Sequence, residues 1–255
     1  MDKKITYEEW IRNPSESRVR IVGERDVAKN IYNDKYNKMM LLCGGKIEYY
    51  LFHEDTRRYI IYLKMPSDSI KKLTYDVVIE FSTEENIKRI LNNLNGYRVK
   101  FFSNDPNFVF TYAYSYNKNG LICPYLKHKI NEKALKEKPK ITNPNAVVGY
   151  VKAFYFAYIF MKNKGLFNKL NWLQAGNIQQ MNQILNRSVL SSDEKLAEVN
   201  RLKQTQKIGP KITTKGNIEQ DTAAQVSKNL RRSVKITNKA LRSKSASQVK
   251  RTKRI

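Results

Sequence analysis

The chain has 255 residues, and its 48 Lys and Arg against 23 Asp and Glu give a formal net charge of +25 at pH 7. This excess argues against an ordinary near-neutral cytosolic enzyme and favours a polyanionic or acidic partner. Cys43 and Cys123 belong to no Cys-x-x-Cys pair, which excludes a disulfide scaffold and a thiolate metal site and favours a reducing compartment. The first ten residues lack the apolar stretch of a secretion signal, so we expect a chain that is not exported.

The aromatic residues and the basic charge together divide the chain into three parts. The last of them is Trp172, and none of the following 83 residues is Phe, Tyr or Trp. Because aromatic side chains supply much of the buried area of a core, we expect a mixed α+β globular body over residues 1–172 that is large enough to fold by itself. We expect a helical seam segment at 173–208 and a basic C-terminal arm at 209–255. Residues 201–255 contain 16 Lys and Arg against two acidic residues.

The first half of the body has the composition of an antiparallel sheet. Residues 39–43 and 46–52 flank Gly44 and Gly45, which predicts a β-hairpin because paired glycines adopt the positive φ angles of a tight turn. Pro66 and the Asn and Gly clusters mark the ends of further strands. These strands are predicted at residues 58–64, 73–81, 97–102 and 108–116.

A helix is predicted directly after the strand at 73–81. Ser82 and Glu85 have the spacing of a capping box, in which each side chain bonds the other's backbone N–H. We expect this helix to run to about Leu94.

A second helix is predicted over residues 144–164. Asn143 suits its N-cap, Pro144 its first position, and Gly165 the position just past its end. Residues 153–161 are apolar all round, so the helix must be buried either in protein or in lipid. Lys152 favours the protein core, because a charged lysine near the centre of a bilayer is costly.

An apolar stripe with polar flanks follows in the seam segment. Ser191 and Glu194 form a second capping box that divides the stripe between two helices. A stripe at spacings of three and four residues predicts helices with one face to bury, against either the body or a neighbouring subunit. The residues assigned to this packing are Ile178, Met181, Leu185, Val189, Leu196, Val199 and Leu202.

No motif predicts catalysis. Gly45-Lys46 fails the phosphate-loop pattern, because Ile47 stands where Ser or Thr is needed. His53 and His128 lie among charged residues and are interpreted as surface histidines, and neither cysteine has a histidine beside it in sequence.

One carboxylate pair remains as a candidate for metal-dependent nuclease chemistry. Asp76 and Glu80 are four positions apart on a predicted strand, so both side chains point to one face. We interpret them as exposed-face residues that flank buried Val77 and Ile79.

The arm carries the strongest functional pattern. Its basic residues surround a thin apolar stripe, and three partners suit it: nucleic-acid phosphates, an anionic membrane or an acidic protein groove. A solvated tail that only keeps the protein soluble is the fourth reading. The missing aromatic side chains disfavour base stacking and membrane docking. The candidate binding residues are Lys228, Arg231, Arg232, Lys235, Lys239, Arg242, Lys244, Lys250, Arg251, Lys253 and Arg254.

Three blocks of the body carry a resemblance to a known group. They are residues 75–81, residues 101–114, and residues 143–150 with the aromatic helix that follows. Together these blocks resemble small virion proteins from the structural-gene modules of tailed bacteriophages with AT-rich genomes, including the crAss-like group. The similarity spans residues 20–170, and its motifs are turns and core segments. It implies a virion component, and it assigns no site residue.

These features predict an α+β fold with an antiparallel β-rich N-terminal body, a buried aromatic helix, amphipathic helices and an extended basic C-terminal arm. The expected function is a non-enzymatic virion structural protein, a ring component of the head-to-tail connector or neck that is assembled in the host cytoplasm. Its expected partners are further copies of itself, other virion proteins and packaged DNA. The alternative is a sequence-nonspecific nucleic-acid-binding or packaging-accessory protein. Neither function needs a cofactor or a metal.

Overall fold

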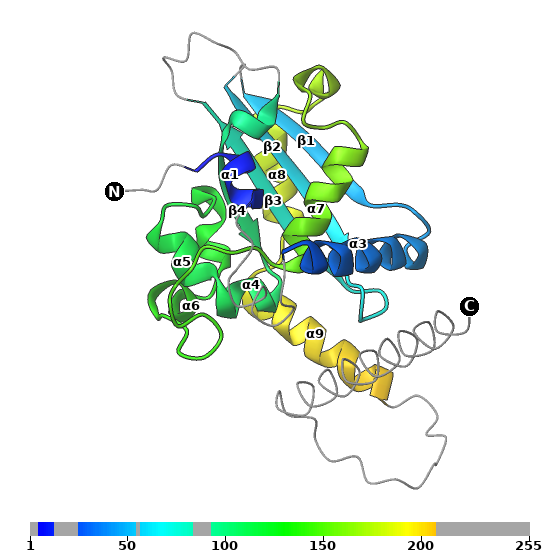
Figure 1. Cartoon of the computed structure of the whole chain (residues 1–255), viewed down its shortest axis with the longest axis vertical. Helices are drawn as coiled ribbons and strands as arrows, with labels where there is room; N and C mark the ends of the chain where they lie inside the picture. Colours follow the sequence, from blue (N-terminus) through cyan, green and yellow to red (C-terminus); the bar gives the residue numbers. More distant parts are fainter. Residues whose placement is uncertain (1–4, 13–24, 55–56, 84–92, 208–255) are drawn as a thin grey trace, which may run out of the picture. The chain divides into compact units, whose positions relative to one another are not determined.

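A computed structural model describes residues 5–12, 25–54, 57–83 and 93–207 (Figure 1). The elements up to the fourth strand are α1 (Tyr7–Arg12), α3 (Arg25–Leu42), β1 (Glu48–Glu54), β2 (Arg58–Pro66), β3 (Thr74–Ser82), η1 (Leu94–Gly96) and β4 (Arg98–Ser103). The elements after it are α4 (Pro106–Thr111), α5 (Ala113–Lys118), η2 (Pro124–Lys129), α6 (Glu132–Lys136), α7 (Lys152–Asn163), η3 (Lys169–Trp172), α8 (Ile178–Ser188) and α9 (Ser192–Lys207).

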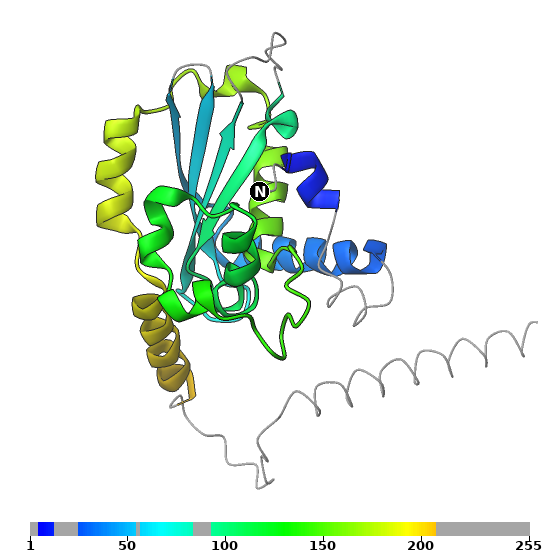
Figure 2. The ribbon, with the colours of Figure 1, turned by 90° about the vertical axis from the view of Figure 1, so that its left-hand side faces the viewer.

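The four strands form one antiparallel sheet in the order β1-β2-β3-β4. One row across the sheet pairs Tyr50 with Tyr62, Tyr62 with Val78, and Val78 with Phe102. Residues 59–63 and 76–81 are buried without interruption, as expected for central strands that are covered on both faces. Figure 2 shows the two layers: α8 lies against one face, and α7 lies against the other with α1 and α3.

The core on the α7 side is built from aromatic rings. Phe154 of α7 is fully buried, and its ring lies within 6.2 Å, centroid to centroid, of the rings of Trp10, Phe101, Phe108 and Tyr116. Offset and edge-to-face pairs of this kind stabilise a core beyond the area that they bury. The predicted buried aromatic helix is therefore confirmed, and so is the α+β fold class.

A buried chain of hydrogen bonds ties the N-terminal helix to this core. The indole Nε1 of Trp10 donates to the Tyr116 hydroxyl over 2.6 Å, and that hydroxyl donates to the carbonyl of Gly149 over 2.7 Å. Both polar ends of these large side chains are thus satisfied inside the core, as buried polar groups require. The chain joins α1, α5 and the segment before α7.

The predicted strands at 58–64, 73–81 and 97–102 are confirmed as β2, β3 and β4. The predicted strand at 39–43 is wrong, because these residues end α3 and begin the turn that follows it. Tyr32, Tyr36 and Met39 are buried at spacings of four and three, which is the period of a helix. Gly44 and Gly45 do take positive φ angles of 65° and 74°, but they end a helix instead of closing a hairpin, a common place for left-handed glycine.

The predicted strand at 108–116 is also wrong, because this segment forms α4 and α5. Asp105 caps α4 by accepting a hydrogen bond from the Asn107 N–H, and Pro106 occupies the first turn. Both are helix-start features. The aromatic and β-branched composition of the segment resembles a strand, while its capping residues specify a helix.

The aromatic helix begins at Lys152 and not at Pro144. Instead of capping a helix, the Asn143 side chain bonds the N–H and the carbonyl of Val147 and also the carbonyl of Thr111. It therefore orders the loop that leads to α7. Gly165 follows the helix as predicted, with φ at 65°. The helix expected from Ser82 to Leu94 falls largely on residues 84–92, which lie outside the described residues, as does the arm at 209–255.

Candidate functional site

The seam residues of α8 pack inside the molecule. Met181, Leu185 and Val189 are each no more than 2% exposed, and Ile178 packs against the same core. The helix lies along β1 on the face away from α7 (Figure 2). Of the two alternatives for this stripe, the structure shows packing against the body.

The seam residues of α9 pack against a separate small cluster. Val199 is buried with Ile70 and Leu73, and Leu202 packs partly against them. Leu196 is half-buried. The predicted capping box is present, because the Glu194 carboxylate accepts hydrogen bonds from the Ser191 N–H and hydroxyl, and the Glu194 N–H donates to that hydroxyl.

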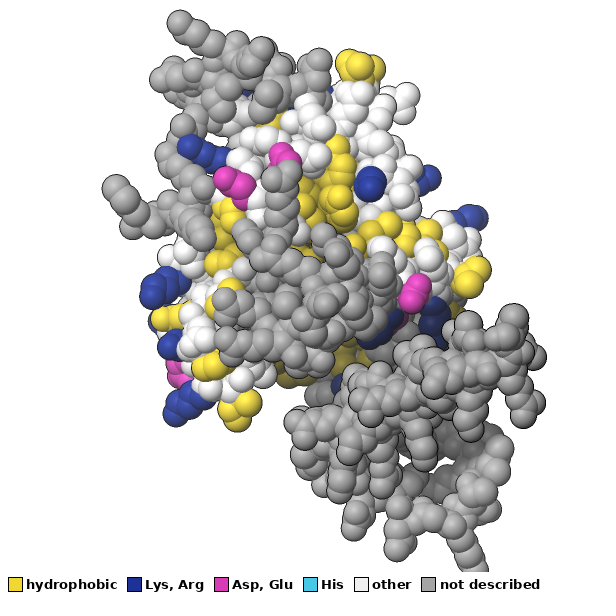
Figure 3. Space-filling model, viewed as in Figure 1, with side chains coloured by type: hydrophobic (Ala, Val, Ile, Leu, Met, Phe, Trp, Pro, Cys, Tyr) yellow, Lys and Arg dark blue, Asp and Glu magenta, His cyan; other side chains and the backbone are white. Residues whose placement is uncertain are grey.

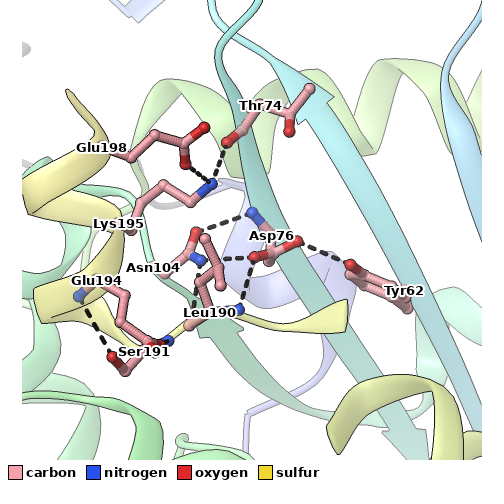
Figure 4. A network of polar contacts seen from close by, with 9 residues as sticks. All are labelled: Tyr62, Thr74, Asp76, Asn104, Leu190, Ser191, Glu194, Lys195 and Glu198. Carbon is pink, nitrogen blue, oxygen red and sulfur yellow. Dashed lines mark hydrogen bonds and ion pairs between the residues drawn. The ribbon is translucent and has the colours of Figure 1, made fainter. Parts of the chain in front are cut away.

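Asp76 is buried in a polar network, which makes its predicted exposure wrong. It is 3% exposed, and its carboxylate accepts hydrogen bonds from the Tyr62 hydroxyl at 2.8 Å, the Asn104 Nδ2 at 2.6 Å and the Leu190 N–H at 3.3 Å. Figure 4 shows these donors converging on the carboxylate from β2, from the end of β4 and from the chain between α8 and α9. The network therefore fastens the α8–α9 connection to the sheet.

Lys195 extends the same network to α9. Its side chain is almost fully buried, and its Nζ donates to the Thr74 carbonyl at 2.9 Å and to Glu198 at 2.7 Å (Figure 4). A buried ammonium needs such partners, because an unpaired charge in the interior is costly. Lys195 therefore anchors α9 beside the start of β3.

Glu80 is also buried, at 5% exposure, and the prediction of an exposed side chain is wrong here too. Its carboxylate pairs with the Arg58 guanidinium at 3.1 Å, and Arg58 also lies over the Tyr125 ring. Burial works to lower the pKa of Arg58, but the hydrogen bond and the charge of Glu80 raise it overall. Asp76 and Glu80 do share one face of the sheet as predicted, and each is bound by groups of the fold.

The described residues contain no group of three or more His, Cys, Asp or Glu side chains that could hold a metal ion. His128 is exposed and His53 is half-buried. Cys123 is fully buried, and burial raises the pKa of its thiol well above the ordinary value. A thiol of this kind stays protonated and is a poor nucleophile. Cys43 is half-buried, and its thiol donates to the Met40 carbonyl.

A charged cavity lies where α3, β1 and the β2–β3 turn meet. This lysine groove, of about 860 Å³, is lined by five lysines, and Gln206 near the end of α9 also borders it. In Figure 3 basic and hydrophobic side chains lie next to each other on the right-hand edge of the view, where α3 ends. The lysines of the groove are Lys38, Lys46, Lys64, Lys71 and Lys72.

The two carboxylates that line the lysine groove are both engaged in ion pairs. Glu48 pairs with Lys64 at 3.6 Å, and Asp68 pairs with Lys152 of α7. The groove therefore keeps a strong positive excess, which attracts anionic groups. It can bind carboxylates or phosphates through lysine ammonium groups, which act as flexible point charges.

The lysine groove is not apparent from the sequence. Its lysines come from three segments, at residues 38–46, 64 and 71–72, that only the fold brings together. The one local clue is the pair Lys71-Lys72 in the turn after Pro66. The candidate binding residues of the arm, from Lys228 to Arg254, all lie outside the described residues.

Among the residues that the structure describes, no helix is both long and apolar enough to cross a membrane. The sequence matches no protein-family model, and comparisons with curated proteins and with solved structures give no match.

Proposed function

We propose that this chain is a non-enzymatic structural protein of a virion, a ring component of the head-to-tail connecting region whose basic arm holds neighbouring subunits or packaged DNA. One observation carries the proposal, namely the separation of charge along the chain. The last described helix, α9, ends at Lys207, and residues 208–255 then hold 13 Lys and Arg against Glu219 and Asp221. A segment of this composition cannot bury enough apolar surface by itself, so it gains its contacts from an oppositely charged partner.

The carboxylates of the sheet support a structural role. Asp76 and Glu80 are the pair that a hydrolytic mechanism would use, and both are held by hydrogen bonds within the fold. Their partners fix the α8–α9 connection and the start of β2. Replacing Asp76 and Glu80 together by alanine should therefore lower the stability of the fold, and no magnesium-dependent cleavage activity should be lost.

Two groups of exposed apolar side chains on the body are suited to contacts between the subunits of a ring. A closed ring joins two different surfaces of each subunit. Leu170 and Leu173, at the end of the sheet near η3, are 68% and 82% exposed, and Phe110 and Ile141, near α4, are 46% and 91% exposed. The segment around η3 and the helix α4 lie toward opposite ends of the sheet in Figure 1. A contact between one pair and the other pair of the next subunit would continue around a ring.

Light scattering of the purified full chain tests this proposal. We expect a mass several times the 29.9 kDa of one chain, and rings in electron micrographs. The double variant L170E/L173E should shift the mass to that of the monomer, because a charge in an apolar contact is costly to bury. L41E/L42E, which changes two other exposed leucines by the same charge, is the matched control and should leave the mass unchanged. A full chain that remains monomeric with and without DNA would overturn the ring.

A sequence-nonspecific nucleic-acid-binding or packaging-accessory protein is the second candidate, and the charge of the arm favours it. If the arm neutralises about ten phosphates, its affinity for DNA should fall by about five decades between 50 and 200 mM salt. A full-length variant with Gln at positions 228, 231, 232 and 235 should show a shallower salt dependence. Tight, steeply salt-dependent binding by a chain that stays monomeric would favour this second function over the ring component.

A further inference from the structure

We infer that the lysine groove binds an acidic peptide segment of a partner protein, and that the segment places one apolar side chain beside Leu42 and Ile70. This inference concerns the described body alone. It stands whether or not the chain is a virion component, because it depends on neither the arm nor the ring.

The lysine groove has an excess of positive charge. Glu48 is paired with Lys64, and Asp68 is paired with Lys152. Lys38, Lys46, Lys71 and Lys72 are all exposed and form no ion pair within the part of the chain that is described. Four unpaired ammonium groups around one cavity select an occupant with several negative charges.

An apolar surface lies beside the lysines of the groove. Met39, Leu42, Ile70 and Leu73 contribute to the walls, and Leu42 is 68% exposed. Leu41, at the same end of α3, is 83% exposed. Exposed leucines grouped in this way are typical of a protein-binding surface. Phosphate contacts would leave them uncovered, and no aromatic side chain that could stack on a base is found among the described residues of the groove.

Two segments of this chain, the arm and α6, are poorly suited to occupy the groove. The arm has the same charge sign as the groove, so the two repel each other and can attract the same kind of partner. The acidic residues of α6 are already matched by lysines, because Glu132 pairs with Lys136 and Glu137 pairs with Lys133. Helix α6 of a second copy therefore offers no free acidic segment to the groove, and a partner of different sequence with several free carboxylates suits it better.

The backbone at Lys72 supports the same inference. Lys72 has a φ of 65°, in the left-handed region that favours glycine and strains other residues. The turn before it is fixed by Ser67, whose hydroxyl accepts hydrogen bonds from the N–H groups of Ser69 and Ile70. The turn therefore holds the backbone of Lys72 in a fixed place at the rim of the groove, at the expense of stability.

Cys43 provides a local readout in the full chain, because it lines the groove. The probe is a short peptide of Asp and Glu with one central Leu, and the measurement is the rate of Cys43 alkylation, with buried Cys123 resolved separately by mass spectrometry. We expect the peptide to slow alkylation of Cys43. K71E/K72E should need about tenfold more peptide, because two attractions become repulsions. The matched control K118E/K127E, on exposed lysines of α5 and η2, should behave as wild type.

Two further measurements sharpen the test. K72G should weaken protection without lowering the thermal midpoint of unfolding, because glycine relieves the strain and removes the charge. A peptide with Gly in place of Leu should protect less well. The inference is overturned if the acidic peptide does not slow Cys43 alkylation, or if both double variants lose protection equally. It is also overturned if single-stranded DNA of equal charge protects Cys43 better than the peptide, which would assign the groove to nucleic acid.

Discussion

Asn104 and Asp76 bind each other twice: the Asn104 Nδ2 donates to the Asp76 carboxylate at 2.6 Å, and the Asp76 N–H donates to the Asn104 Oδ1 at 2.8 Å. The same Nδ2 donates to the Leu190 carbonyl at 3.1 Å. One fully buried amide thus joins β3, the end of β4 and the chain that leads into α9. Its removal would leave several polar groups without partners in the interior.

Asn104→Ala should therefore lower the free energy of unfolding by about 3 kcal/mol, because each buried polar group left unpaired costs about 1–3 kcal/mol. Urea denaturation of the variant and the wild type measures this difference. Asn117→Ala is the matched control, since the Asn117 Nδ2 makes one bond, to the Leu135 carbonyl, at a half-buried position. Equal losses of unfolding free energy in the two variants would contradict the larger contribution that we assign to Asn104.

The stability of the fold should depend on pH through Asp76. Burial raises the pKa of its carboxyl, although Tyr62, Lys195, Asn104 and the Leu190 N–H act in the opposite direction. The folded chain therefore holds this proton more tightly than the unfolded chain. The stabilising contribution is fully present below the unfolded pKa of about 3.9 and is lost as pH rises through the raised folded pKa.

Urea denaturation of wild type and Asp76→Asn from about pH 7 down to about pH 4 tests this direction. Asp76→Asn should be less stable throughout, because its amide N–H would face the donors of Asn104 and Leu190. The difference in unfolding free energy between the two proteins should widen as the pH falls, since only the wild type gains from protonation at this position. A difference that narrows toward low pH would show that the folded pKa lies below the unfolded one.

Gly176 is required by the start of α8. A Cβ at this position would lie 2.6 Å from the Gln180 Oε1 and 3.1 Å from the Phe52 Cδ1. The Gln180 Oε1 completes the capping box of α8 by accepting from the Asn177 N–H. Gly176→Ala should therefore displace Gln180 and cost about 1 kcal/mol or more, the usual value of a lost helix cap.

A double-mutant cycle with Gln180→Ala identifies the cause. The combined loss should be smaller than the sum of the two single losses by about 0.5 kcal/mol or more, because both substitutions remove the same hydrogen bond. Gly44→Ala is the control, since no atom lies within 4 Å of its added Cβ and only its positive φ is strained. Its effect should add to that of Gln180→Ala. Additivity in the Gly176 cycle would refute the shared cause.

The hydrogen bond from Lys195 to Thr74 should control the opening of α9. Lys195→Met keeps the apolar stem of the side chain but removes the donor to the Thr74 carbonyl and the ion pair with Glu198 inside α9. A hydrogen bond from a charged group contributes about 1.5–3 kcal/mol, so amide hydrogen exchange in α9 should become at least about tenfold faster, with no change in α8. Lys203→Met, on an exposed lysine of the same helix, should leave exchange unchanged. Faster exchange in α8 and α9 together would contradict this local role.

Local sequence patterns predict those helices and strands that are determined by residues close to one another in the sequence. The β-branched and aromatic runs of β2, β3 and β4 suit a sheet, and the Ser191 and Glu194 pair bonds itself at the start of α9. The segment at 108–116 shows the limit, because its composition favours a strand while Asp105 and Pro106 begin a helix. Tertiary packing of the aromatic face then decides between the two.

Burial of polar side chains could not be predicted, because their partners are distant in the sequence. Asp76 is bonded by Asn104, 28 positions away, and by Leu190, 114 positions away. Asn143 looks like a helix cap, yet its amide reaches back to Thr111 across 32 positions. The lysine groove is hidden for the same reason, since residues 38, 64 and 72 become neighbours only when α3 meets the sheet.

The last described helix, α9, packs through a small apolar cluster of its own. In this cluster Val199 lies against Ile70 and Leu73, apart from the large aromatic cluster. A pulling force applied at the C-terminal end of α9 would therefore act first on this small cluster. The helix would then detach from the body while the sheet and the aromatic core stay folded.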